Sequence, residues 1–354
     1  MTSSYTVRVA FLDVGQGDSI VVSIPATQEA VIVDCPDAVV VFEYLRSQNI
    51  RHIRGLLITH LHLDHFKDTV KFLENCSTQL GTQCERLIFN WPSNRKVPPP
   101  DADHHDRISP SDRHNERQKR TAYQELLSWT DMYEDDCLPL TRERDQTPLT
   151  GSIPHIIKIL QPSHGQMGKL LEMGLNNTSA ILRVEGSGTS ALLTADIEPT
   201  GWRELQQRNS NLHSDILKFP HHGAWKDADP DEILDSVQPS VVVISVGSDG
   251  TRYDHPNAHV FQALAVRPEI RLLCTQATSQ CGSDMPHVRS KVIKEFEQAT
   301  ETHAVPLIRT TRGCPCAGTV ILDLADQIRV IQPEIMFHHD RIIRQHFHHH
   351  KCAI

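Results

Sequence analysis

Apolar and polar residues are arranged along the first sixty positions in a pattern typical of short strands. Residues 5–12 alternate apolar with polar or small side chains, and residues 19–24 and 30–33 form two further apolar runs. Residues 39–48 have the spacing of an amphipathic helix, and residues 55–58 form another short apolar run. The order strand, strand, strand, helix, strand predicts the first half of an α/β fold.

A similar pattern returns in the second half of the chain. Strands are expected at residues 86–90, 156–160, 179–185, 190–194, 215–219 and 240–246, and helices after Pro199, Pro230 and Pro256. Strands that alternate with helices predict a second sheet with helices packed on it. The fold class that we expect is a four-layer αβ/βα sandwich over residues 1–265.

A segment at about residues 92–154 departs from this pattern. Residues 101–120 carry many charges of both signs and few apolar side chains, which favours a surface insert, and residues 121–132 have the pattern of one helix. The segment contains a basic run that could meet a polyanion, although a solvated charged loop is the favoured interpretation. The run consists of Arg113, Arg117, Lys119 and Arg120.

The last ninety residues predict a small α+β extension. Residues 271–275 resemble a strand, 287–302 a helix, and 318–331 a hairpin. We therefore expect an extension at 266–336, followed by a loosely ordered, His-rich tail at 337–354 that has no function of its own.

Composition and charge exclude several classes of protein. A formal charge of -9 argues against a chain-wide basic surface, although it leaves room for a local basic patch. No apolar run is long enough for a membrane span, and the first residues lack the pattern of a signal peptide. Nine cysteines, unevenly placed, favour reduced thiols and a cytoplasmic protein. No pattern identifies a protein partner.

The apolar run at 55–58 leads directly into a dense cluster of metal-ligand side chains, Thr-His-x-His-x-Asp-His at residues 59–65. His60 and His62 are two residues apart, so an extended backbone directs both rings to the same face. Asp64 and His65 follow where a helix is expected to start. A histidine pair alone means little in a chain with 22 histidines. Three imidazoles and a carboxylate buried together would be destabilising without a metal, which favours a pair of metal ions.

Three later stretches each place a polar side chain where an apolar strand ends. Asp196 follows residues 190–194, and a carboxylate there could bridge two cations or, alternatively, cap the helix at Pro199. His221 and His222 follow the strand at 215–219, and His255 follows the apolar run at 240–246.

Together, these motifs resemble the metallo-β-lactamase-fold hydrolases. They are most similar to the subfamily typified by the hydrolase domain of the DNA-uptake protein ComEC, here without that protein's membrane channel. The matching stretches follow one another in order over roughly residues 5–265. They are Asp13 to Ser19, Asp34, Thr59 to His65, Asn176 to Ser179, Leu192 to Asp196, His221 to Gly223, and Ile244 to Pro256.

The resemblance implies a role for each matching residue. One divalent metal ion would be bound by His60 and His62, a second by Asp64, His65 and His222, and Asp196 would bridge the two. Catalysis would depend on Asp64, on Asp34 as a support for a ligand imidazole, and on His221 and His255 facing the substrate. Gly17 and Asp18 would lie close to the substrate.

The sequence departs from the family at one ligand position. Most members with two metals have a third histidine on the first metal, whereas Asn177 stands here, as in the subfamily. An amide oxygen is a weaker and harder ligand than imidazole, which tilts the choice of metal from Zn²⁺ towards Mn²⁺. His164 is an alternative ligand. Ala195 replaces the usual glycine and is expected to fit without disturbance.

Two such metals would activate a bridging water near neutral pH, and the hydroxide would attack an electrophilic centre. The resemblance favours a phosphodiester substrate, either nucleic acid or a nucleotide, and hence a phosphodiesterase or nuclease. The same ligands could serve hydrolysis of an ester, thioester or lactam. A sensor or binding component without turnover is the remaining alternative.

A separate group of cysteines suggests a structural metal site in the extension. Four thiols with spacings of six residues and one residue could bind one Zn²⁺, although four reduced core thiols are an equally ordinary interpretation. The four are Cys274, Cys281, Cys314 and Cys316.

Overall fold

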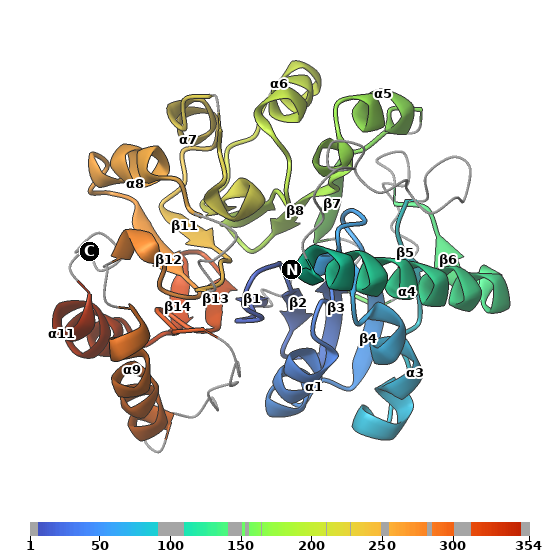
Figure 1. The fold of residues 1–354 in the computed structure, drawn as a ribbon, viewed down its shortest axis with the longest axis horizontal. Coiled ribbons are helices and arrows are strands. Elements are labelled where there is room, and N and C mark those ends of the chain that lie inside the picture. Colours follow the sequence, from blue (N-terminus) through green and yellow to red (C-terminus); the bar gives the residue numbers. More distant parts are fainter. Residues whose placement is uncertain are drawn as a thin grey trace.

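The structure, a computed structural model, consists of two β-sheets that face each other, with helices on their outer faces (Figure 1). It describes residues 6–90, 110–140, 151–152, 156–163, 165–209, 211–226, 228–248, 255–281, 285–300 and 313–347. Within the described residues, one sheet has eight strands and the other has six. The predicted four-layer αβ/βα sandwich is therefore confirmed.

The first sheet has the strand order β14-β13-β1-β2-β3-β4-β5-β6. β1 to β3 are antiparallel, whereas β3 to β6 are parallel. Every residue of β2 and β3 is buried, which explains why these strands are continuous apolar runs in the sequence. The strands are β1 (Val7–Phe11), β2 (Ile20–Ile24), β3 (Glu29–Val33), β4 (His52–Leu57), β5 (Leu87–Ile88), β6 (Cys137–Leu138), β13 (Val320–Leu324) and β14 (Arg329–Gln332).

The second sheet has the order β12-β11-β10-β9-β8-β7. β7 to β9 are antiparallel and β9 to β12 are parallel, so each sheet has an antiparallel half and a parallel half. The strands are β7 (Ile157–Gln161), β8 (Ile181–Glu185), β9 (Ser190–Leu193), β10 (Ile216–Lys218), β11 (Val241–Ile244) and β12 (Arg271–Cys274).

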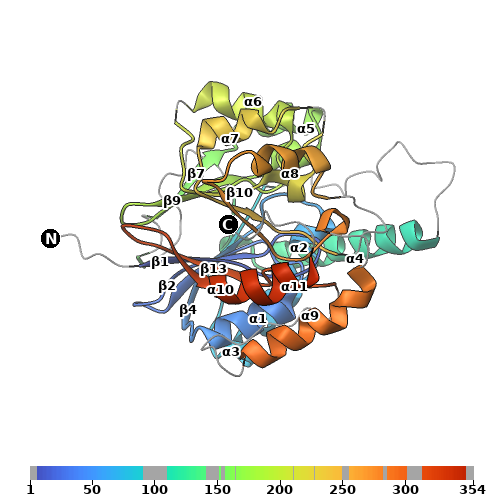
Figure 2. The ribbon, with the colours of Figure 1, turned by 90° about the vertical axis from the view of Figure 1, so that its left-hand side faces the viewer.

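Helices cover the outer face of each sheet (Figure 2). α1, α3 and α4 lie on the first sheet, and α6, α7 and α8 on the second. The helices are α1 (Ala38–Ser47), α2 (Leu63–Phe66), α3 (Thr69–Leu80), α4 (Pro110–Met132), α5 (Met167–Glu172), α6 (Pro199–Arg208), α7 (Asp231–Val237), α8 (Ala258–Ala265), α9 (Met285–Thr300), α10 (Ile335–Phe337) and α11 (Arg344–His346).

Three apolar cores separate the four layers. The central core joins the inner faces of both sheets, for example Val9 and Val22 with Leu182 and Val243. The other two cores lie between each sheet and its helices. Burial of apolar surface on both faces of both sheets is the main stabilising contribution to such an arrangement.

The segment after residue 265 does not form an extension apart from the sandwich. β12 continues the second sheet beside β11, and β13 and β14 continue the first sheet beside β1. The expectation of a loosely ordered tail is wrong for residues 337–347. Helical turns run from Ile335 to His346, and Ile342, Ile343 and Phe347 are buried in the core of the second sheet. Residues 348–354 lie outside the described residues.

The expected insert also differs from the prediction. One helix, α4, spans Pro110–Met132 and so begins eleven residues before the helix predicted at 121–132. β6, which follows it, adds an edge strand to the first sheet. Within the described part of the chain, we find no helical segment with the length and hydrophobicity that a membrane span requires.

Candidate metal centre

The predicted ligands come together because they follow the carboxyl ends of neighbouring parallel strands. β3 and β4 end at Asp34 and shortly before His60 in the first sheet, and β9 and β10 end shortly before Asp196 and His222 in the second. Carboxyl ends of parallel strands share one edge of a sheet. The two sheets therefore contribute their ligands to one common edge of the sandwich.

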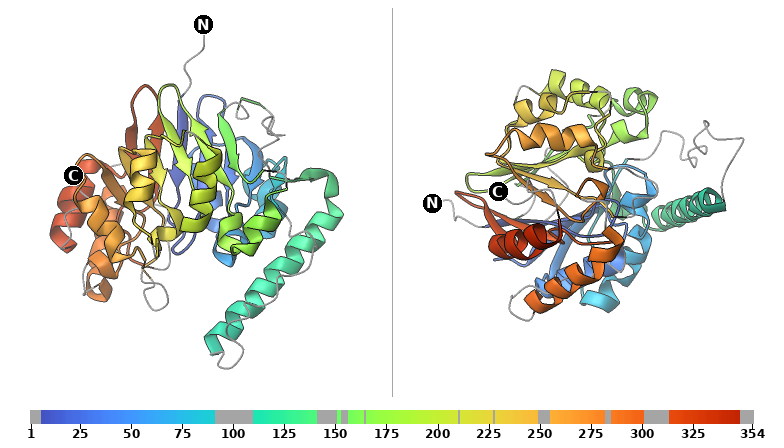
Figure 3. Two further views of the ribbon diagram at one scale, coloured as in Figure 1. Left: turned by 90° about the horizontal axis from the view of Figure 1, so that it is seen from above. Right: turned by 60° about the vertical axis from the view of Figure 1, so that its left-hand side comes forward.

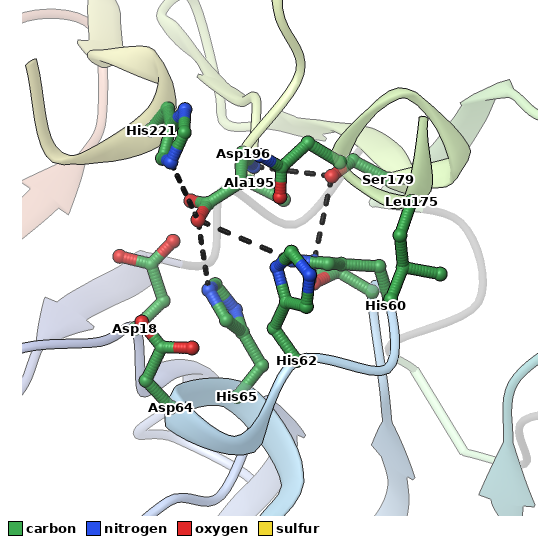
Figure 4. Close-up of polar contacts among 12 residues, drawn as sticks. Asp18, His60, His62, Asp64, His65, Leu175, Ser179, Ala195, Asp196 and His221 are labelled. Carbon is green, nitrogen blue, oxygen red and sulfur yellow. Dashed lines mark hydrogen bonds and ion pairs between the residues drawn. The ribbon is translucent and has the colours of Figure 1, made fainter. Parts of the chain in front are cut away.

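Four of these residues form a compact cluster. One ligand atom from each of Asp64, His65, Asp196 and His222 lies within 4.8 Å of every other. Asp196 Oδ2 is at the centre, 3.3 Å from His65 Nε2 (Figure 4). It is also 3.3 Å from His222 Nε2. His222 Nε2 is also 3.6 Å from Asp64 Oδ2. His65, Asp196 and His222 are almost completely buried.

The protonation of this cluster indicates that a cation fits it. His222 Nδ1 lies 2.8 Å from the carbonyl oxygen of Ser245, which can only accept, so this nitrogen carries the proton. His65 Nδ1 is held in the same way by Asp34 Oδ2 at 2.7 Å. Each ring therefore directs its Nε2 at the Asp196 carboxylate, neither Nε2 has a hydrogen-bond partner, and in the neutral ring this nitrogen carries a lone pair. A divalent cation would satisfy these converging lone pairs.

Electrostatics show how strongly this cluster attracts positive charge. Burial disfavours the charged form of His222, but Asp196 and Asp64 raise its pKa to about 10. Burial would raise the pKa of Asp196, but His222 and His65 hold it well below its ordinary value. In the absence of a metal the cluster would therefore hold protons where a metal-loaded site holds the cation.

Asp34 is placed for the supporting role that the resemblance implies. It is fully buried, and besides His65 it accepts hydrogen bonds from the backbone N–H of Thr59 at 2.8 Å and from the Thr59 hydroxyl at 2.7 Å. It therefore fixes both the orientation of the His65 ring and the segment that leads to His60.

His60 and His62 lie beside the cluster and form a less complete site. His60 Nε2 is 3.1 Å from His62 Nδ1 and 4.0 Å from Asp196 Oδ2. Burial, followed by the neighbouring rings of His65 and His62, holds the pKa of His60 well below its ordinary value, so this ring is neutral and able to bind a metal. Leu175 and Ser179 lie beside His60 in Figure 4, and the Ser179 hydroxyl is 3.4 Å from its Nδ1.

Asn177 does not fill the vacant ligand position, contrary to our expectation. Its side chain is fully buried, and its Oδ1 accepts from the backbone N–H groups of Glu198 at 3.2 Å and Gly201 at 3.0 Å. Its Nδ2 donates to the Met173 carbonyl and to Glu198. The amide therefore holds the start of α6. The alternative ligand, His164, lies outside the described residues.

Gly17 and Asp18, which we expected to lie close to the substrate, pack against Asp64 and Lys218 respectively. A Cβ at Gly17 would lie 2.1 Å from the Asp64 carbonyl oxygen, so the glycine allows the ligand loop to pack against it. Asp18 is almost completely buried and pairs with the ammonium of Lys218.

Lys218 is the functional residue that the sequence prediction missed. It ends β10, is fully buried, and places its Nζ 3.6 Å from Asp196 Oδ1, on the side of the carboxylate opposite the imidazoles. Its Nζ also donates to the Ala195 carbonyl at 2.8 Å. Lys218 thereby orients Asp196 with Oδ2 towards the ligands. In the sequence, the indication of this role is a single lysine in an otherwise apolar strand, just before His221 and His222.

His221 and His255 lie next to each other beside the cluster, His221 partly exposed and His255 buried. The His221 side chain is 25% exposed, and its Nε2 is 4.0 Å from Asp196 Oδ2. The two rings are 5.8 Å apart between centroids. Burial lowers the pKa of both rings, that of His255 to about 4, so both are neutral near pH 7. Neutral imidazoles can donate or accept a proton there.

The four cysteines of the predicted zinc site share a core but do not form a metal site. All four are buried in the core of the second sheet. Among the described residues, no three of their sulfurs belong to a group of ligand atoms within 4.8 Å of one another. Cys316 Sγ contacts His338 Nε2 at 3.5 Å instead. As arranged here, none of the four is in a disulfide.

No protein-family model matches the chain. It is similar to ComE operon protein 3 of Bacillus subtilis (strain 168), with 25% identity over 287 residues. This alignment covers 76% of the chain and 32% of the relative, so the chain spans about a third of that protein's length. The structure of human tRNase Z, short form, matches 66% of this chain and 91% of its own, with 14% identity and a TM-score of 0.33.

Proposed function

We propose that the protein is a metal-dependent phosphodiesterase that cleaves nucleic acid with two divalent metal ions. The observation that carries the proposal is the convergence of two buried histidine Nε2 atoms and two carboxylates, with neither Nε2 in a hydrogen bond. Asp64, His65, Asp196 and His222 would hold one ion. His60 and His62, with Asp196, would hold the other.

The ligand set suits Zn²⁺ or Mn²⁺. Imidazole favours Zn²⁺, and carboxylates together with a half-site of only two histidines favour Mn²⁺. Divalent cations supply Lewis-acid polarisation of a phosphoryl oxygen and a nucleophile derived from water near neutral pH.

The remaining residues bind the substrate and move protons. His221, partly exposed beside Asp196, is placed to donate a hydrogen bond to a non-bridging phosphoryl oxygen. His255, next to it, is placed to protonate the leaving oxygen. Lys218 and Asp34 orient Asp196 and His65, so the ligands remain in position during turnover.

A phosphodiester is favoured over an acyl substrate for two reasons. Two cations a few ångströms apart suit in-line attack at phosphorus. In addition, the chain is similar to part of ComE operon protein 3, and its motifs resemble the subfamily for which a phosphodiester substrate is expected.

The test combines elemental analysis with substrate cleavage. We expect about two divalent ions per chain, and cleavage of an end-labelled oligonucleotide with Mn²⁺ or Zn²⁺ but not of p-nitrophenyl acetate or a chromogenic lactam. His222→Ala should abolish cleavage and reduce the metal content. His52→Ala is the matched control, because His52 is exposed at the opposite end of β4. A wild-type protein that cleaves only the ester or the lactam would overturn the proposal.

A further inference from the structure

Helix α4 packs directly on the helix that carries metal ligands. The Tyr123 ring meets the Phe66 ring edge to face, with 5.6 Å between centroids, and Phe66 immediately follows His65 in α2. Beyond this anchor α4 projects from the body of the sandwich (Figure 3). The helix is therefore fixed next to the candidate metal centre and extends past it.

One face of α4 is buried where it packs on the core, and the same face extends towards the candidate metal centre. Tyr123 and Leu126 are fully buried on that face, and Trp129 is 8% exposed. Lys119 lies four residues before Tyr123 and so on the same face, one turn closer to the projecting end. Lys119 is half-buried, whereas Arg117 and Arg120 are exposed.

Lys119 lies on the same face of α4 as Tyr123, whose ring packs on α2 next to His65. Among the described residues, none forms a hydrogen bond or an ion pair with the Lys119 ammonium. A half-buried cation beside the metal ligands is therefore available to an anion from outside the protein.

We propose that Lys119 binds a backbone phosphate of a nucleic acid strand next to the phosphodiester being cleaved, so that α4 forms one wall of the substrate groove. This inference rests on the proposed function. The proposal assigns to Lys119 a phosphate other than the one held at the metal centre. The expected substrate is consequently a polynucleotide, and a substrate with a single phosphodiester would not use Lys119.

The test compares Lys119→Gln with Lys119→Arg and with Arg117→Gln, which removes an exposed charge two residues away. For a single-stranded oligonucleotide, we expect Lys119→Gln to raise KM about tenfold. The slope of log Kd against the logarithm of the salt concentration should fall by about 0.7. The kinetics of bis-p-nitrophenyl phosphate should change by less than about twofold. Lys119→Arg should behave like the wild type, because it keeps the charge.

Equal effects on both substrates, or equal effects of Arg117→Gln and Lys119→Gln, would overturn the inference. Binding of a fluorescein-labelled oligonucleotide to the metal-loaded protein tests the contact independently of turnover. A wild-type protein that binds the oligonucleotide, with Lys119→Gln weaker, supports the phosphate contact even if no substrate is cleaved. No binding by the wild type rejects it.

Discussion

Left-handed backbone is concentrated at the candidate metal centre. Seven non-glycine residues in the described ranges have positive φ, and four of them are Asp34, Ala195, His221 and His222. Each such residue costs about 1–2 kcal/mol. The surrounding packing must therefore compensate, which is common where side chains have to be aimed at a ligand. Ala195 belongs to this group, with a φ of 44°. We had expected it to replace glycine without disturbance, but this backbone conformation strains an alanine.

Gly17→Ala should damage the metal centre although the new methyl group touches no ligand side chain. The added Cβ would lie 2.1 Å from the Asp64 carbonyl oxygen, so the loop that carries Asp64 must move. We expect loss of bound metal and of phosphodiester cleavage, measured by elemental analysis and by an activity assay.

Gly15→Ala is the matched control for this variant. Gly15 also has a positive φ, but the nearest atom to an added Cβ is 4.0 Å away. It should lower the melting temperature through backbone strain and keep the metal. Equal metal loss in both variants would show that strain, rather than the contact with Asp64, is responsible.

At the residue scale, short motifs were sufficient to predict the ligand cluster. His60 to His65 are close together in sequence, and Asp196 and His222 each follow an apolar strand. Asn177 and Lys218 were not predictable in the same way, because their roles depend on partners far away in the chain. Only the fold shows that the Asn177 amide faces the start of α6 and that Lys218 reaches Asp18.

At the scale of elements, the beginning of α6 depends on a residue outside the helix. Two of its backbone N–H groups, at Glu198 and Gly201, donate to Asn177 Oδ1. N–H groups at the start of a helix have no partner within the helix, and leaving them buried without one is destabilising.

Asn177→Ala should therefore destabilise the protein without changing its metal content. We expect a loss of roughly 2–3 kcal/mol in the free energy of unfolding, measured by chemical denaturation. Asn176→Ala is the neighbouring control with a smaller expected effect, since its amide donates only to the Glu198 side chain. A selective loss of metal from Asn177→Ala would restore Asn177 as a ligand.

Most elements of the sandwich were predictable within two or three residues, because their apolar patterns are strong. The first half of α4 and the helical turns after Ile335 were not. Charged residues before position 120 and histidines after position 337 obscured the helical spacing of a few buried side chains, among them Ile342 and Phe347. Packing against the sandwich stabilises both segments, and a local pattern does not reveal that packing.

At the scale of the molecule, the candidate metal ligands belong to both sheets, so a bound metal would join the two halves of the sandwich. Removing it should destabilise the whole fold. A ligand present at 100 times its Kd adds about 2.7 kcal/mol to the free energy of unfolding. We expect a chelator to lower the melting temperature in calorimetry and added Mn²⁺ or Zn²⁺ to restore it.

The stability of the metal-free protein should change with pH in a definite direction. In the metal-free protein, burial disfavours charged rings, but Asp196 raises the pKa of His65 and raises that of His222 to about 10. A raised pKa stabilises the fold fully below the ordinary value of 6.5, and this stabilisation disappears as the pH rises through about 10. The metal-free protein should therefore lose stability between about pH 7 and 10. A gain over that range would contradict this account of the site.

The order of strands in the first sheet could not be predicted from local patterns. β13 lies between β1 and β14, although more than three hundred residues separate β13 from β1. A sequence pattern identifies a strand but does not identify its neighbours, because distant pairings depend on the closure of the whole sandwich.

The position of β13 has a consequence for synthesis on the ribosome. β1 leaves the ribosome well before β13, so its pairing with Val320–Leu324 must wait until the long segment between the two strands has been translated. Until then, one edge of an apolar strand has open backbone N–H and C=O groups, which is the kind of edge that promotes association between nascent chains. Rapid synthesis of the intervening segment, or a chaperone that shields β1, would limit such association before the two sheets close around the candidate metal ligands.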